Sequence, residues 1–91
     1  MDVEVRQLSE VEMAAKNISQ WPTKSNGVSK FPHFFEHAEA CYVIEGEATV
    51  TSEEHGAVKI KKGDYVVFPK GMECYWEVTS DFKKYYHIDE S

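Results

Sequence analysis

Two segments of the sequence combine turn residues with side chains that could do chemistry. One runs from Glu39 to Gly46, and the other runs from Gly63 through the Pro69-Lys70-Gly71 turn to Cys74. Each segment is typical of a short strand that begins or ends at a glycine or proline turn. Glu39 supplies a carboxylate and Cys74 a thiol, so the two could bind a metal ion or serve a reaction if the fold brings them into one interior.

Alternation of side chains along a strand predicts which residues point inward. Cys74, Trp76 and Val78 share one face, and its apolar character predicts that this face looks into the core. The set that begins at Glu39 continues with Cys41 and Val43. If this set also looks inward, Glu39 and Cys74 lie in the same interior. A carboxylate there is costly unless it is paired, hydrogen-bonded or bound to a metal ion.

The elements that must position these residues are mostly short strands. Candidate strands cover residues 2–7, 29–35, 39–45, 47–52, 57–61, 64–68, 74–79 and 82–88. Ser9 and Glu12 fit a capping box, which predicts a short helix over about residues 10–17, whereas the composition of residues 23–27 predicts a loop. The strand spacing predicts an all-β fold, a small antiparallel barrel or sandwich with a short N-terminal helix. We expect one domain over residues 1–91, with the N-terminal strand and helix in 1–20 and the barrel in about 27–88.

Size and charge limit the classes of partner. A chain of 91 residues forms one domain with a thin core, so we expect a homodimer that buries more apolar surface. The net charge of −6 argues against binding to nucleic acid or to an anionic membrane surface. The first residues contain no apolar signal segment, and the sequence has no apolar run of membrane-spanning length. We therefore expect a cytoplasmic protein with reduced cysteines.

The two segments together resemble the motifs of the cupin superfamily, the RmlC-like jelly rolls. Glu39 and Gly46 have the E-x6-G spacing of the first cupin motif, and His33 stands where that motif has a histidine. Gly63, Pro69 and Gly71 match the second motif, in which Cys74 takes the place of a histidine. This resemblance implies a cupin-type antiparallel β-barrel with a ligand pocket inside it.

A more specific resemblance is to small single-domain cupins of unknown function that are related to (S)-ureidoglycine aminohydrolase. It covers about residues 20–88 and rests on Trp21-Pro22, the strand from Glu39 to Gly46, the segment from Phe68 to Trp76, and Lys84-Tyr85-Tyr86. The resemblance implies that the barrel binds or converts a small polar metabolite. Lys84 matches a lysine that is typical of this family.

The resemblance also implies a metal site formed by His33, Glu39 and Cys74. Imidazole, carboxylate and thiolate are suitable ligands for Zn²⁺, Mn²⁺, Fe²⁺ or Ni²⁺. His37 would replace His33 if a bulge shifted the strand register. If the protein is an enzyme, the resemblance implies a metal-dependent hydrolase or isomerase that acts on a small polar substrate, with Glu39, Cys74 and Lys84 as candidate catalytic residues.

Other interpretations of the same residues remain open. The interior could be a metal-free pocket in which neighbouring groups satisfy Glu39, lined by Phe35, Tyr42, Phe68 and Trp76. Cys41 and Cys74 could be small core residues, and Lys84 could be a strand-edge charge. Three hypotheses follow: an enzyme for a small nitrogen compound, a non-catalytic ligand-binding protein, and a structural protein with a filled barrel.

Overall fold

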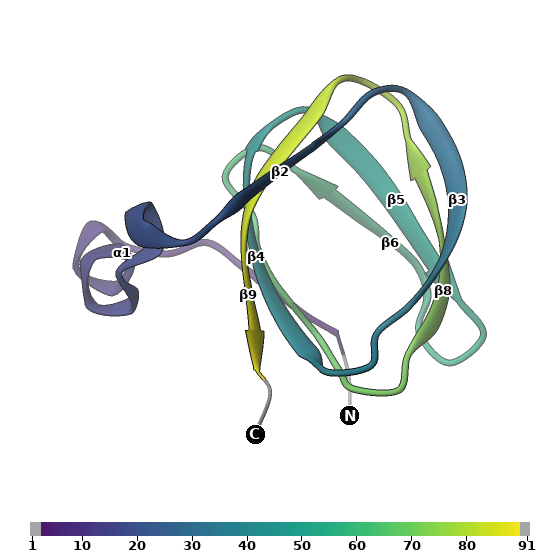
Figure 1. Ribbon diagram of the computed structural model, residues 1–91, viewed down its shortest axis with the longest axis horizontal. Helices are drawn as coiled ribbons and strands as arrows, with labels where there is room; N and C mark the ends of the chain where they lie inside the picture. The colour runs from purple at the N-terminus through teal and green to yellow at the C-terminus, as the bar shows by residue number, and fades with distance from the viewer. Residues whose placement is uncertain (1–2, 90–91) are drawn as a thin grey trace.

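The computed structural model describes residues 3–89, which form two facing antiparallel sheets (Figure 1). Sheet A contains, in spatial order, β1 (Glu4–Arg6), β7 (Tyr65–Phe68), β4 (Ala38–Glu45), β9 (Phe82–Asp89) and β2 (Thr23–Asn26). Sheet B contains β3 (Ser29–Phe34), β8 (Glu73–Val78), β5 (Glu47–Ser52) and β6 (Gly56–Lys61). The all-β prediction is confirmed. The sheets form a jelly roll that stays open, because β2 and β3 each lie at the edge of a different sheet.

Most predicted strands lie within one residue of the observed ones, and the exceptions are N-terminal. The strand expected over residues 2–7 is confined to Glu4–Arg6 within the described residues. The loop expected over residues 23–27 is wrong, because Thr23–Asn26 pairs with β9 as strand β2. This strand is entirely polar, since one of its edges has no neighbour and its side chains are largely exposed. Its sequence therefore lacks the apolar alternation that identifies a half-buried strand.

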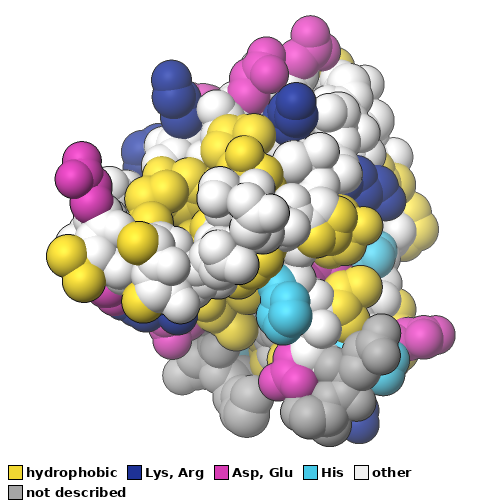
Figure 2. Space-filling view, turned by 60° about the vertical axis from the view of Figure 1, so that its left-hand side comes forward, with side chains coloured by type: hydrophobic (Ala, Val, Ile, Leu, Met, Phe, Trp, Pro, Cys, Tyr) yellow, Lys and Arg dark blue, Asp and Glu magenta, His cyan; other side chains and the backbone are white. Residues whose placement is uncertain are grey.

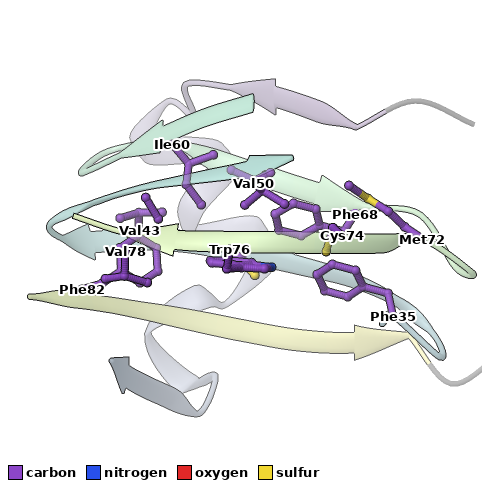
Figure 3. Packing of buried hydrophobic residues seen from close by; sticks show 13 residues of the cluster. Phe35, Val43, Val50, Ile60, Phe68, Met72, Cys74, Trp76, Val78 and Phe82 are labelled. Carbon is purple, nitrogen blue, oxygen red and sulfur yellow. The ribbon is translucent and has the colours of Figure 1, made fainter. Parts of the chain in front are cut away.

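The core lies between the two sheets and contains the inward set predicted from alternation (Figure 3). Cys41 and Val43 of β4 are fully buried, and Trp76 and Val78 of β8 are almost so. The cluster also includes Phe35, Ala48, Val50, Ile60, Val66, Phe68, Met72, Cys74 and Phe82. Phe35 follows β3 and is fixed by its backbone, because its N–H donates to Met72 and its carbonyl accepts from Gly71.

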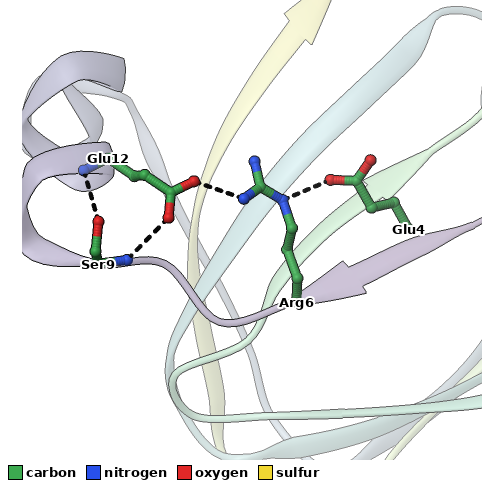
Figure 4. A network of polar contacts seen from close by, with 4 residues as sticks. All are labelled: Glu4, Arg6, Ser9 and Glu12. Atoms are coloured by element: carbon green, nitrogen blue, oxygen red, sulfur yellow. Dashed lines mark hydrogen bonds and ion pairs between the residues drawn. The ribbon is translucent and has the colours of Figure 1, made fainter.

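The predicted helix is confirmed as α1 (Glu10–Lys16), and η1 (Ile18–Gln20) follows as one 3-10 turn. The capping box forms as expected, since Ser9 Oγ accepts from the Glu12 N–H and the Glu12 carboxylate accepts from the Ser9 N–H (Figure 4). Arg6 donates to Glu12 at 2.6 Å and to Glu4 at 2.8 Å, which ties the helix to β1.

Helix α1 lies outside the two sheets (Figure 1) and has no buried residue. Hydrophobic side chains are visible between charged ones on this side of the molecule (Figure 2), and Val11 of α1 is 79% exposed. Within residues 3–89, no helix has the length and apolar character that a bilayer span requires. The expected homodimer and cytoplasmic location stay predictions.

Two turn residues hold the ends of the sheets. Gly46 has φ 85° and packs against the backbone of Asp81, so it has no room for a side chain. Asp64 is 3% exposed, and its carboxylate accepts hydrogen bonds from the Lys61 N–H and from the Gln7 side chain. The Asp64 carboxylate thus connects the β6–β7 turn with the segment that follows β1.

Candidate functional site

An ion pair between Glu39 and Lys84 lies inside the jelly roll. The two residues come from the neighbouring strands β4 and β9, and both have the inward parity of their strands. Lys84 Nζ lies 3.5 Å from Glu39 Oε2, and the side chains are only 9% and 14% exposed. Each charge compensates the other where little water reaches either group. The strand-edge interpretation of Lys84 is therefore wrong.

Trp76 forms one wall of this charged site. Lys84 Nζ lies 4.6 Å from the centre of the Trp76 ring, within range of a cation–π interaction. The indole is 3% exposed, and its Nε1–H has no acceptor at good hydrogen-bond geometry among the described residues, although it lies close enough to the Cys74 thiol to lower the pKa of that thiol. Figure 3 shows the indole across the middle of the core. A buried N–H donor without an acceptor is costly, so this group is one that a ligand could satisfy.

The two free cysteines occupy different environments. Cys41 is fully buried beside the ion pair, with Sγ 3.3 Å from Glu39 Oε2. Burial raises the pKa of the Cys41 thiol to about 12, and the Glu39 carboxylate adds to this effect. Cys74 is 9% exposed, and its Sγ lies 3.4 Å from the backbone oxygen of His33. Burial also raises the pKa of Cys74, so both thiols stay protonated and weakly nucleophilic near neutral pH.

His33 lies on β3 opposite Cys74 and has an exposed side chain. Partial burial lowers its pKa most, Glu39 raises the pKa, and Lys84 and Lys24 lower it. The imidazole is therefore held towards its neutral form.

The aromatic residues predicted for the pocket divide between two faces. The Phe35 ring stacks on Phe68, with centroids 4.6 Å apart, and meets the His33 ring edge-on at 4.5 Å. These two phenylalanines and Trp76 belong to the interior cluster. Tyr42 has the opposite parity, between the inward Cys41 and Val43, so it lies on the outer face of sheet A and does not line the interior.

The predicted metal set does not form. Among residues 3–89, no group of three or more His, Cys, Asp or Glu side chains is placed to hold a metal ion. His33, Glu39 and Cys74 are therefore not arranged as three ligands. His37, the alternative to His33, lies in the loop between β3 and β4. The carboxylate that would bind a cation already faces the Lys84 ammonium, so the donor set does not fit a divalent metal.

Two openings lead towards the ion pair. A cavity of about 30 Å³ lies between the edge strands β2 and β3, and we call it the seam cavity. It is lined by Lys24, Asn26, Phe31, His33, Trp76 and Lys84. A wider cleft of about 200 Å³, the end cleft, is lined by His33, Phe34, Phe35, Glu36, His37, Glu39 and Ile88. Lys84 is thus reached from the seam and Glu39 from the end, with His33 at both openings.

The sequence pattern did not indicate three residues of the seam cavity. Lys24 and Asn26 lie on β2, which was interpreted as a loop, and Phe31 lies on β3 without having been singled out. The spacing of Lys24 and Asn26 places both on one face of a strand, which is a weak signal in a polar segment. The Phe31 ring lies 6.0 Å from Trp76 and nearly parallel to it.

Comparison with solved structures supports the architecture. A DUF861 family protein from Thermotoga maritima is 32% identical, with a TM-score of 0.93 over 97% of this chain and 100% of that one. The EutQ protein of Clostridium difficile is 18% identical, with a TM-score of 0.65 over 92% of this chain and 64% of that chain, so it shows the fold alone.

Comparison with protein sequences gives a partial relative and a family. A 40-residue stretch is 35% identical to the raffinose operon transcriptional regulatory protein of Pediococcus pentosaceus, and this match covers 44% of the chain but only 14% of that protein. The family model for the EutQ-like cupin domain matches residues 13–86, which confirms the cupin resemblance. The chain belongs to the EutQ-like cupin domain family.

Proposed function

We propose that the interior of the jelly roll binds a small polar metabolite directly through protein groups, with the Lys84 ammonium in place of a metal cation. The observation that carries this proposal is the buried Nε1–H of Trp76, which has no well-placed acceptor in the described part of the chain and lies beside the Lys84–Glu39 ion pair. An empty apolar core needs no such groups, whereas a ligand with acceptor atoms would satisfy the indole and share the ammonium.

The ligand must be small. The seam cavity measures about 30 Å³ and the end cleft about 200 Å³, which is below the volume of a typical drug-sized pocket. Ureido and amino acid derivatives are suitable candidates, because the sequence resembles relatives of (S)-ureidoglycine aminohydrolase. Such molecules present carbonyl or carboxylate oxygens to the donors of Trp76 and Lys84.

A thermal-shift series tests this proposal. The probes are acetate, acetamide, urea, glycine and N-carbamoylglycine, tested before and after treatment with a chelator. A probe present at 100 times its Kd stabilises the folded state by about 2.7 kcal/mol. A probe that binds should therefore raise Tm by several degrees, both in untreated protein and in chelator-treated protein. Trp76→Phe removes the indole donor and should reduce the rise, whereas Trp21→Phe is the control. No rise with any probe, or a rise that needs added metal, would contradict the proposal.

A second candidate function is proton transfer on a bound carbonyl compound. Glu39 lines the end cleft, and its carboxylate lies between the Lys84 ammonium and the Cys41 thiol. In such a reaction Glu39 would take a proton from the carbon beside the carbonyl, and Lys84 would stabilise the negative charge on the oxygen. Exchange of that C–H for deuterium in D₂O, followed by NMR, tests this function. Exchange that Glu39→Gln leaves unchanged would count against it.

A further inference from the structure

Apart from Phe31, the residues that line the seam cavity can donate hydrogen bonds or carry positive charge. Lys24 and Asn26 reach it from β2, His33 from β3, and Lys84 from β9. No aspartate or glutamate contributes to its lining within residues 3–89, although the whole chain has a net charge of −6. A cationic cavity on an acidic protein favours an anionic ligand over a cationic one.

The positive charges at the seam exceed what the nearby acid can neutralise. Both Lys24 and Lys84 are close enough to lower the pKa of His33, and Glu39 is the acid that raises it. Glu39 is paired with Lys84 at 3.5 Å, so the charge of Lys24 has no matching carboxylate in the cavity lining. A bound anion would balance this charge.

A second and independent observation indicates a ligand that carries a hydrogen-bond acceptor. Trp76 is 3% exposed and lines the seam cavity, and within residues 3–89 its Nε1–H meets only the weak acceptor of the Cys74 thiol and no acceptor at good hydrogen-bond geometry. An indole N–H can only donate, so the missing partner must be an acceptor. About 10–15 Å³ accommodates one water molecule, so a cavity of about 30 Å³ holds a group with two or three non-hydrogen atoms. A carboxylate group has this size and offers two acceptor oxygens.

We propose that the seam cavity binds the carboxylate of a small monocarboxylate, which enters between the unpaired edges of β2 and β3 and is held by Lys24, Lys84 and Trp76. This inference rests on the proposed function, because it names the ligand class of the same interior. Beyond the proposed function, we infer that the negative charge of the ligand determines which molecule binds and that Lys24 of strand β2 forms part of the site. The uncharged remainder of the ligand extends towards the end cleft, where Glu39 and Phe35 lie.

Isothermal titration with acetate and with acetamide tests the inference. The two probes have nearly the same shape and differ in charge. We expect the unmodified protein to bind acetate at least about tenfold more tightly than acetamide, the difference that a charge-assisted hydrogen bond provides. Lys24→Met should weaken acetate binding about fivefold and Lys24→Glu more strongly, because Coulomb attraction becomes repulsion. Lys24 is exposed on an edge strand, so both variants should fold.

Lys30→Met is the matched control, because Lys30 lies on β3 with 66% of its side chain exposed and pairs with Glu77 outside the cavity. This variant should bind acetate as the unmodified protein does. Equal binding of acetate and acetamide, or no effect of both Lys24 variants, would overturn the seam inference while leaving small-ligand binding in place. Binding of none of acetate, acetamide, urea, glycine and N-carbamoylglycine would overturn the proposed function and the inference together.

Discussion

Replacing Lys84 by methionine leaves the Glu39 carboxylate buried without its cation. The Glu39 side chain is 14% exposed, and Lys84 Nζ lies 3.5 Å from it. Methionine keeps most of the volume of lysine and can still contact the Trp76 ring through its sulfur. The substitution therefore removes the charge and leaves little additional cavity in the core.

The expected loss is large for a domain of this size. Removing one partner of a buried ion pair costs about 3–5 kcal/mol, because the remaining charge is desolvated and uncompensated. A change of about 1 kcal/mol moves Tm by roughly 4–8 °C in a domain of 60–100 residues. We therefore expect Lys84→Met to lower Tm by more than about 12 °C near neutral pH.

A double-mutant cycle measured by urea unfolding isolates the pair. Glu39→Gln removes the carboxylate charge, so Lys84→Met combined with Glu39→Gln should recover much of the stability that Lys84→Met loses alone. Lys83→Met is the control, since Lys83 is the neighbouring residue on β9 with the opposite parity. A loss below about 1 kcal/mol for Lys84→Met, or simple additivity in the cycle, would refute the argument for a buried, compensated pair.

Three further predictions concern residues outside the Lys84–Glu39 pair. Gly46→Ala should lower the free energy of unfolding by at least about 3 kcal/mol, because the new Cβ would collide with the Asp81 carbonyl at a positive φ. Gly56→Ala is the control: its Cβ would meet open space, so the same urea titration should show a loss of only about 1–2 kcal/mol. The Cys41 thiol should resist iodoacetamide until the protein unfolds, as mass spectrometry can show, because its pKa is raised from 9.0 to about 12. Since the fold favours the protonated thiol, Cys41 should also make the free energy of unfolding fall as pH rises from about 9 to about 12. Early alkylation would contradict the first expectation, and a free energy of unfolding that stays constant over this pH range would contradict the second. Asp64→Ala should lower the free energy of unfolding by about 1–3 kcal/mol and speed amide hydrogen exchange in β1, because it removes a buried acceptor. Unchanged exchange in β1 would contradict the claim that Asp64 holds the N-terminal segment in place.

Strand positions were predictable wherever alternation placed apolar residues on one face. The sets that contain Val43 and Trp76 identify β4 and β8, and the Ser9 capping box identifies the start of α1. Strand β2 was not predictable, since its side chains are polar and its place depends on pairing with β9, which is distant in sequence. The open seam depends on the same long-range pairing.

The candidate site was predictable as a list of residues but not as a set of contacts. Glu39 and Lys84 were each singled out, yet their ion pair depends on the register between β4 and β9, which the sequence does not give. The expected metal ligands do not assemble for the same reason, because the Glu39 carboxylate faces the ammonium of Lys84, which comes from a third segment. Tyr42 was expected in the pocket although alternation places it on the strand face opposite Cys41, and the structure follows the alternation.

The indole N–H resonance of Trp76 tests the central claim most directly. Trp21 provides an internal reference, because it stacks on His87 in the other sheet and belongs to neither the seam cavity nor the core cluster. In a ¹H–¹⁵N spectrum, titration with acetate should shift the Trp76 indole signal downfield as its N–H gains an acceptor, while the Trp21 signal stays in place. An unmoved Trp76 signal throughout the titration, or equal movement of both indole signals, would contradict the proposal that this buried donor belongs to a ligand site.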